Sequence, residues 1–247
     1  MIRTGTLRQS LANRRPLQTP DGTHYFKSDF IQSQPEDAVA PQAFLIEQAP
    51  NSVIRPHFHQ ENQFQVVVGG GAELGRHAVA PVSVHYASRH TGYGPITSGA
   101  QGVSYFSLRD RVTALAYYLP ESRELMEDVP RRNLFADHVP VAEPAQLRAL
   151  HGVEATPVLP LQADGVAAWA VRLAPGASHW LPLPAGGADR FHLVLSGAVV
   201  RDGESLPRLA TVFASAQETP LVLQAGDDGA QVLVLQFPQK GVGLNPP

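Results

Sequence analysis

The sequence contains no cysteine, no long apolar run and almost no helical periodicity. With 0 cysteines among 247 residues, a disulfide framework, thiol catalysis and a zinc–thiolate site are all excluded. No stretch approaches the ~18 consecutive apolar residues of a membrane-spanning helix. The start of the chain also lacks the apolar run of a secretory signal. We therefore expect a cytoplasmic protein with no membrane partner.

An excess of charge of one sign is also lacking. Charged residues make up 17% of the chain, and the formal net charge is −3. Four arginines near the start have no aromatic residues interleaved in a binding pattern, so we interpret them as a solvated arm: Arg3, Arg8, Arg14 and Arg15. No nucleic-acid partner is expected. The apolar content of 43% indicates a folded, soluble protein.

Short runs of Val, Leu, Phe and Tyr are abundant, and they are separated by Gly, Pro and Asp. The 21 glycines and 22 prolines are spread along the chain rather than gathered in one linker. This pattern predicts an all-β sandwich or barrel. The expected strands are Ala43–Glu47, Phe64–Val68, Val82–Tyr86, Val103–Leu108, Thr113–Tyr118, Ala167–Leu173, Phe191–Leu195, Ala210–Phe213, Leu221–Leu223 and Gln231–Phe237.

An internal repeat links the two halves of the chain. Moved back by 127 residues, Phe191–Gly197 falls on Phe64–Gly70, and Phe213 falls on Tyr86. Such a long period, repeated once, predicts two copies of one β domain. We expect a first barrel with its arm at 1–118, a linker with short helices at 119–152, and a second barrel at 153–247. The linker helices are expected after Glu121, stopped by Pro130, and from Pro144, ended by Gly152.

The repeat also serves as an internal control on candidate site residues. Each candidate of the first copy is replaced in the second, at an offset of 125 residues for the two upstream histidines and of 127 for the others: His57 by Pro182, His59 by Pro184, Gln63 by Arg190, His85 by Val212, His90 by Gln217 and Tyr93 by Pro220. Residues needed only for the fold should be apolar or turn-forming in both copies. The first copy is therefore predicted to carry a site, and the second is predicted to be a scaffold.

His57 and His59 are the centre of the predicted site. Alternation along a strand sends both imidazoles to the same face. Gln63 follows after a turn and begins an apolar strand that climbs to Gly70. Two histidines and a side-chain oxygen on the next strand provide part of the ligand set of a metal site inside a barrel.

The stretch from His57 through Gln63 to Gly70 resembles the first motif of the cupin superfamily. That motif reads His-x-His, three or four residues, Glu, six residues, Gly, and here Gln63 stands in place of the Glu. In the second motif, Tyr93 or His90 lies nearest the family's third histidine. The resemblance implies two tandem cupin jelly-roll barrels joined by a short helical linker, with a degenerate second barrel. It also implies a homodimer.

The resemblance further implies a divalent metal ion, Fe, Mn, Ni or Zn, held by His57 and His59. Gln63 and one of Tyr93, His85 or His90 would complete the shell. Because an amide adds no charge and cannot act as a base, the alternative that Gln63 orients a ligand or water is equally open. Tyr93 could bind the metal or donate a proton, or be a packed turn residue. The sequence does not decide which face of the strand that contains His85 points into the cavity. His90 is expected at the surface.

Two functions follow from these observations. The leading one is a metal-dependent small-molecule enzyme of the oxygenase or isomerase type, with its site in the first barrel. The alternative is a non-catalytic bicupin that binds a small molecule or acts as a scaffold. The alternative would be favoured by a metal-free first barrel that holds a sugar or organic acid among His57, His59, Gln63 and Gln65.

Overall fold

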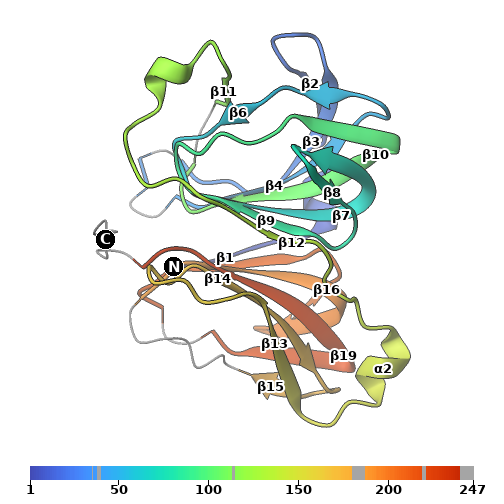
Figure 1. The fold of residues 1–247 in the computed structure, drawn as a ribbon. Coiled ribbons are helices and arrows are strands. Elements are labelled where there is room, and N and C mark those ends of the chain that lie inside the picture. Colours follow the sequence, from blue (N-terminus) through green and yellow to red (C-terminus); the bar gives the residue numbers. More distant parts are fainter. Residues whose placement is uncertain (35, 38–39, 113–114, 180–186, 219–220, 240–247) are drawn as a thin grey trace. The chain divides into compact units, whose positions relative to one another are not determined.

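The structure is a computed structural model that describes residues 1–34, 36–37, 40–112, 115–179, 187–218 and 221–239. Two antiparallel sheets hold most of these residues, which confirms the all-β prediction (Figure 1). The contacts divide the chain into two units. The N-terminal unit is Gln9–Val139, and the C-terminal unit combines Met1–Arg8 with the described residues from Pro140 onward.

The N-terminal unit is built on a nine-stranded sheet. Its path runs β12-β9-β7-β10-β4-β3-β2, with β5 added to β10 and β8 added to β7, while β11 pairs with β6 in a separate ribbon. The strands are β2 (Arg15–Gln18), β3 (His24–Ile31), β4 (Gln42–Gln48), β5 (Val53–Ile54), β6 (His57–Phe58), β7 (Gln63–Leu74), β8 (His77–Val79), β9 (Val84–Ala87), β10 (Ile96–Arg109), β11 (Tyr117–Tyr118) and β12 (Asn133–Ala136).

The C-terminal unit is built on an eight-stranded sheet. Its path runs β1-β18-β16-β19-β14-β13, with β15 added to β19 and β17 added to β16. The strands are β1 (Ile2–Gly5), β13 (Val153–Leu159), β14 (Ala167–Leu173), β15 (Ser178–His179), β16 (Arg190–Arg201), β17 (Glu204–Pro207), β18 (Thr211–Ala214) and β19 (Leu223–Gln236). A short helix, α1 (Leu7–Leu11), follows β1.

The strand bounds confirm the internal repeat. Adding 127 to the limits of β7, β9 and β10 gives the limits of β16, β18 and β19, and adding 125 to β4 gives β14. The packing repeats as well. The rings of Phe64 and Tyr86 lie 4.9 Å apart in one core, and those of Phe191 and Phe213 lie 5.0 Å apart in the other. Each unit therefore buries the same apolar faces of the same strands.

The outermost strand beside β9 or β18 has a different origin in each unit. In the N-terminal unit it is β12, which pairs with β9 and lies in the segment that the sequence pattern marks as a linker. In the C-terminal unit it is β1, which pairs with β18 and lies in the predicted arm. Both are strands of four residues, too short for alternation to reveal them.

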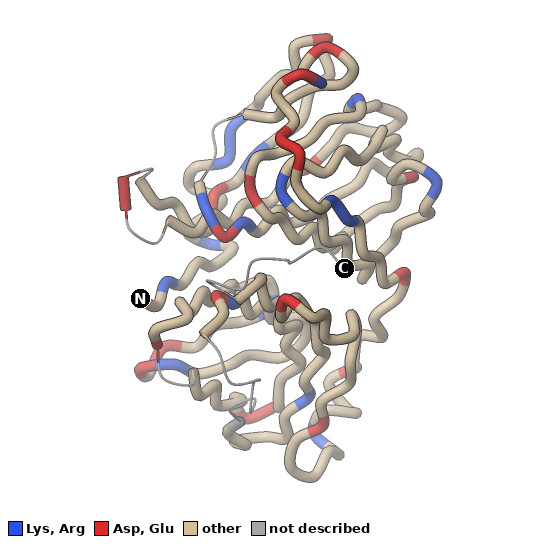
Figure 2. Tube along the Cα trace, turned by 60° about the vertical axis from the view of Figure 1, so that its left-hand side comes forward, with Lys and Arg blue, Asp and Glu red and all other residues tan. Residues whose placement is uncertain are grey.

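The segment from 119 to 152 contains little helix. A 3₁₀ helix at Arg123–Leu125 replaces the longer helix expected before Pro130, and α2 (Pro144–Arg148) begins at Pro144 as predicted. Of the expected strand Thr113–Tyr118, the structure has β11, while residues 113–114 lie outside the described residues. No described helix is long and apolar enough to cross a membrane. Acidic and basic residues are both scattered along the trace of each unit (Figure 2).

Candidate functional site

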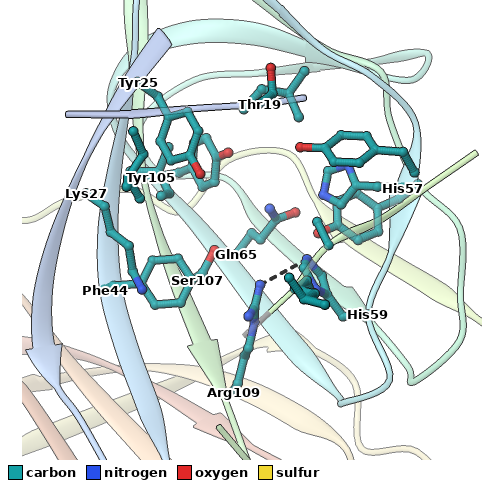
Figure 3. Close-up of a pocket in the computed structure, with 17 residues that line it drawn as sticks. Thr19, Tyr25, Lys27, Phe44, His57, His59, Gln65, Tyr105, Ser107 and Arg109 are labelled. Atoms are coloured by element: carbon teal, nitrogen blue, oxygen red, sulfur yellow. Dashed lines mark hydrogen bonds between the residues drawn. The ribbon is translucent and has the colours of Figure 1, made fainter. Parts of the chain in front are cut away.

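His57 and His59 lie at the edge of a cavity of about 150 Å³ in the N-terminal unit (Figure 3). His57 is on β6, and His59 follows directly after that strand. Both side chains are buried, with 5% and 6% exposure, and their ring centroids are 5.3 Å apart. The structure thus brings both imidazoles to one cavity.

Hydrogen bonds to the backbone fix which nitrogen of each ring carries the proton. The Nδ1 of His57 is 2.8 Å from the carbonyl oxygen of Arg55, and the Nδ1 of His59 is 2.9 Å from that of Leu115. A carbonyl oxygen only accepts, so both Nδ1 atoms must carry hydrogen. Burial lowers the pKa of His57 to about 4 and that of His59 well below its usual value, so both rings are neutral at pH 7. Each Nε2 therefore carries an electron pair that can accept a hydrogen bond.

Tyr93 and Gln63 extend this cluster. Tyr93 pairs with His57 through two backbone hydrogen bonds, and the two rings lie 4.5 Å apart. Gln63, the first residue of β7, donates from Nε2 to the Tyr93 hydroxyl over 2.8 Å. Burial raises the pKa of Tyr93 to about 12, so its hydroxyl stays protonated. Because this hydroxyl already accepts from Gln63, its own hydrogen remains available for another acceptor.

Arg109, the last residue of β10, reaches into the same cluster. Its Nη2 donates to the Nε2 of His59 over 2.9 Å, and its Nε donates to the Oε1 of Gln63 over 2.8 Å. The Arg109 side chain is buried, with 6% exposure. Desolvation lowers the pKa of Arg109, but a guanidinium remains protonated in proteins. A positive charge therefore lies among the candidate ligands.

His85 and His90 add no donor atom to this cluster. The His85 ring lies 5.2 Å from that of Tyr93, but its two nitrogens face the side-chain amides of Gln65 and Asn133, at 2.8 and 2.9 Å. His90 is buried rather than at the surface as expected, because the loop around Glu127 covers it. The backbone N–H of Glu127 donates to the Nδ1 of His90 over 3.1 Å. Neither ring offers an electron pair to the cavity.

Aromatic residues and a second cation form the opposite wall of the cavity (Figure 3). Lys27 and Arg109 lie 4.2 and 5.0 Å from the centre of the Phe44 ring. Lys27 is paired with the buried Asp29 over 3.1 Å. The remaining wall includes three tyrosines whose pKa values are raised, chiefly by desolvation, so that each keeps its proton at pH 7: Tyr25, Tyr105 and Tyr118.

The sequence analysis missed Arg109, although the repeat contains a signal for it. The offset of 127 that places Gln63 on Arg190 also places Arg109 on Gln236. The structure pairs these residues in both units: Arg109 lies opposite Gln63, and Arg190 lies opposite Gln236. The Arg190 Nε donates to the Gln236 Oε1 over 2.9 Å. An arginine–glutamine pair is thus kept in both units with its two residues exchanged between the strands.

Comparison with known structures identifies the fold. No protein-family model matches the sequence, and no curated protein matches it. A pirin from Escherichia coli in complex with nickel(II) is 11% identical, with a TM-score of 0.59 over 97% of this chain and 100% of its own. Quercetin 2,3-dioxygenase from Acinetobacter baumannii is 13% identical, with a TM-score of 0.53 over 97% and 80%. The chain has a bicupin fold.

A third neighbour shows how little the fold says about activity. Vicilin from hazelnut, Corylus avellana, is 13% identical to this bicupin, with a TM-score of 0.52 over 96% of this chain and 86% of its own. A pirin, a dioxygenase and a vicilin therefore share the fold. The function of this bicupin must be argued from its own site.

The residues of this bicupin do not fit a resident divalent metal ion. Within the described part of the chain, no group of three or more His, Cys, Asp and Glu side chains could hold one. The electron pairs of His59 and Gln63 already accept hydrogen bonds from Arg109. A divalent ion at these atoms would lie beside a buried guanidinium, and the two positive charges would repel each other.

Proposed function

We propose that the N-terminal barrel binds a small organic anion directly, with Arg109 as its charged contact and no metal ion. The supporting observation is that the described hydrogen-bond partners of this buried guanidinium are all uncharged, namely Gln42, His59 and Gln63. A buried charge is costly unless an opposite charge accompanies it. A guanidinium has five N–H groups, so two remain for a ligand carboxylate.

The surrounding charges favour Arg109 over Lys27 as the anion contact. The ammonium group of Lys27 is already paired with the carboxylate of Asp29. Desolvation lowers the pKa of Arg109, and Tyr93 and Glu61 act in the opposite direction. A ligand carboxylate that accepts hydrogen bonds from Arg109 would further compensate its positive charge.

The size and walls of the cavity favour a small aromatic acid. An engineered cavity of similar volume is known to hold benzene, and this cavity of about 150 Å³ has the phenol rings of Tyr25 and Tyr105 in its wall. The Nε2 of His57 can accept a hydrogen bond from a ligand hydroxyl. A hydroxybenzoate would therefore satisfy Arg109 and His57 together, and benzoate and salicylate are suitable probes.

Calorimetric titration of benzoate into the purified chain tests this function. We expect Arg109→Gln to weaken binding about tenfold or more, because a charge-assisted hydrogen bond contributes about 1.5–3 kcal/mol. Arg190→Gln, in the same register of the C-terminal unit, is the matched control and should leave the affinity unchanged. Equal affinities for wild type and Arg109→Gln would refute the proposal.

A second candidate function is the metal-dependent oxygenase or isomerase. It is favoured by the free electron pair of His57 and by the nickel(II) complex of the structurally similar pirin. Metal analysis of the purified chain, with His57→Ala as control, distinguishes the two candidates. A stoichiometric metal ion that is lost in His57→Ala would support the metalloenzyme. Homodimer formation and a cytoplasmic location stay predictions.

A further inference from the structure

We propose that the guanidinium of Arg109 takes the place of a divalent cation among the electron-pair donors of the N-terminal barrel. Its removal would convert these donors into a divalent-metal site. This inference goes beyond the proposed anion binding and does not depend on it. It rests on the atoms that surround Arg109.

Two of those atoms are of types that bind metal ions in other proteins, and here they accept hydrogen bonds from the guanidinium of Arg109. The Nε2 of His59 accepts from Nη2 of Arg109 over 2.9 Å, and the Oε1 of Gln63 accepts from Nε over 2.8 Å. Neutral imidazole nitrogens and amide oxygens bind divalent ions through these same electron pairs. The guanidinium therefore uses two positions of a coordination shell.

Two further donors lie beside them. The ring of His57 is 5.3 Å from that of His59, and its Nε2 electron pair is free because Nδ1 donates to Arg55. The Tyr93 hydroxyl is held by Gln63 over 2.8 Å. Two imidazole nitrogens, one amide oxygen and one phenol oxygen thus belong to one buried cluster, and four donors match the four-coordination of Ni(II) or Zn(II).

The C-terminal unit serves as a control, because it has an arginine at the equivalent register but its sequence lacks the two histidines. There Arg190 donates to Gln236 over 2.9 Å at the equivalent register. Gln65 of the N-terminal unit corresponds to His192, whose Nδ1 lies 3.3 Å from the carbonyl oxygen of Val212. The sequence has Pro182 and Pro184 where the other copy has His57 and His59. Removal of Arg190 should therefore create no metal site.

The test is a titration of NiCl2 into four tag-free proteins: wild type, Arg109→Ala, Arg190→Ala and the double variant Arg109→Ala/His57→Ala. Calorimetry gives affinity, and metal analysis after dialysis gives stoichiometry. We expect Arg109→Ala to bind one Ni(II) per chain, with a dissociation constant lower than that of wild type by about tenfold or more. Arg190→Ala should behave like wild type, and the double variant should lose the gain.

Further variants protect the test against a folding defect. Arg109→Met keeps the length of the side chain without its charge and should also gain Ni(II), whereas Arg109→Lys keeps a cation and should not. Circular dichroism confirms that each variant is folded. The proposal is overturned if wild type binds Ni(II) through His57 as tightly as Arg109→Ala, or if the folded variants gain no metal. Benzoate binding to wild type is measured separately, so either proposal can fail alone.

Discussion

The protonation of single ring nitrogens decides what the N-terminal barrel can accept. His57 and His59 each donate from Nδ1 to a backbone carbonyl, so each turns an electron pair toward the cavity. One of those pairs meets Arg109. At the scale of the residue, the site is a buried positive charge with hydrogen-bond acceptors around it, and this arrangement favours an anion with a hydroxyl group.

Gln63→Glu should weaken benzoate binding about tenfold or more, because a carboxylate at Oε1 would neutralise Arg109. Calorimetry measures the change. The repeat supplies a matched control: Gln236→Glu places the same carboxylate against Arg190 in the C-terminal unit. That variant should keep the wild-type affinity for benzoate. An unchanged affinity in Gln63→Glu would show that the charge of Arg109 is not used.

His57→Phe should remove any preference for salicylate over benzoate. The ligand hydroxyl loses the acceptor Nε2 of His57, while the carboxylate keeps Arg109. We expect wild type to bind salicylate more tightly than benzoate by about threefold to tenfold, the contribution of one hydrogen bond. Competition titration gives the ratio for each protein. A wild-type preference that persists in His57→Phe would contradict this role.

His192 should make the C-terminal unit less stable in mild acid. Desolvation lowers its folded-state pKa to about 4, whereas the unfolded chain takes up the proton near pH 6.5. Protons therefore favour the unfolded state between these values, and the free energy of unfolding should fall by about 2 kcal/mol from pH 7 to pH 5. Urea unfolding followed by tryptophan fluorescence measures it. His192→Leu should lose less stability over this interval, and an identical loss would refute the assignment.

At the scale of the element, two glycines approach each other closely where the long strands of each unit pair. A Cβ on Gly70 of β7 would lie 2.1 Å from the carbonyl oxygen of Gly102, and φ at Gly70 is +66°. Gly197 of β16 meets Gly229 at the same 2.1 Å, with φ of +68°. In both units this close approach lies between two register shifts of the strand pair.

Gly70→Ala should lower the free energy of unfolding of the N-terminal unit by about 2 kcal/mol or more, through strain at positive φ and the clash. Gly197→Ala should do the same to the C-terminal unit. All six tyrosines lie in the first half of the sequence and both tryptophans, Trp169 and Trp180, in the second. Near-ultraviolet signals of each kind can therefore follow one unit. An unfolding midpoint equal to that of wild type, in either variant, would contradict the prediction.

At the scale of the whole molecule, the residues of the proposed binding site lie in one copy of a duplicated fold. The N-terminal unit holds the cavity with its two imidazoles and Arg109. The C-terminal unit keeps the arginine–glutamine pair, but its sequence lacks the two histidines. The two units thus share the strands and the close approach of the glycines, whereas the two imidazoles occur in a single copy.

Benzoate at about 100 times its dissociation constant should stabilise the N-terminal unit by about 2.7 kcal/mol, because it binds only the folded state. The transition followed by tyrosine signals should therefore move to higher temperature with ligand concentration. Arg109→Gln, which binds about tenfold or more weakly, should show a stabilisation of only about 1.4 kcal/mol or less at the same concentration. A shift of equal size in wild type and Arg109→Gln would place the ligand elsewhere.

The sequence by itself determined the fold class, the duplication and the two histidines of the cavity. Alternation, turn residues and a repeat of 127 residues are local or periodic signals, and they survive without coordinates. Only the tertiary structure showed that Arg109 meets His59, because 50 residues separate them and the pairing of β10 with β7 places Arg109 opposite Gln63, the first residue of β7 after His59. It also showed that His85 is held by Gln65 and Asn133. Hydrogen-bond partners far apart in the chain are decided by strand register, which composition and motif spacing do not encode.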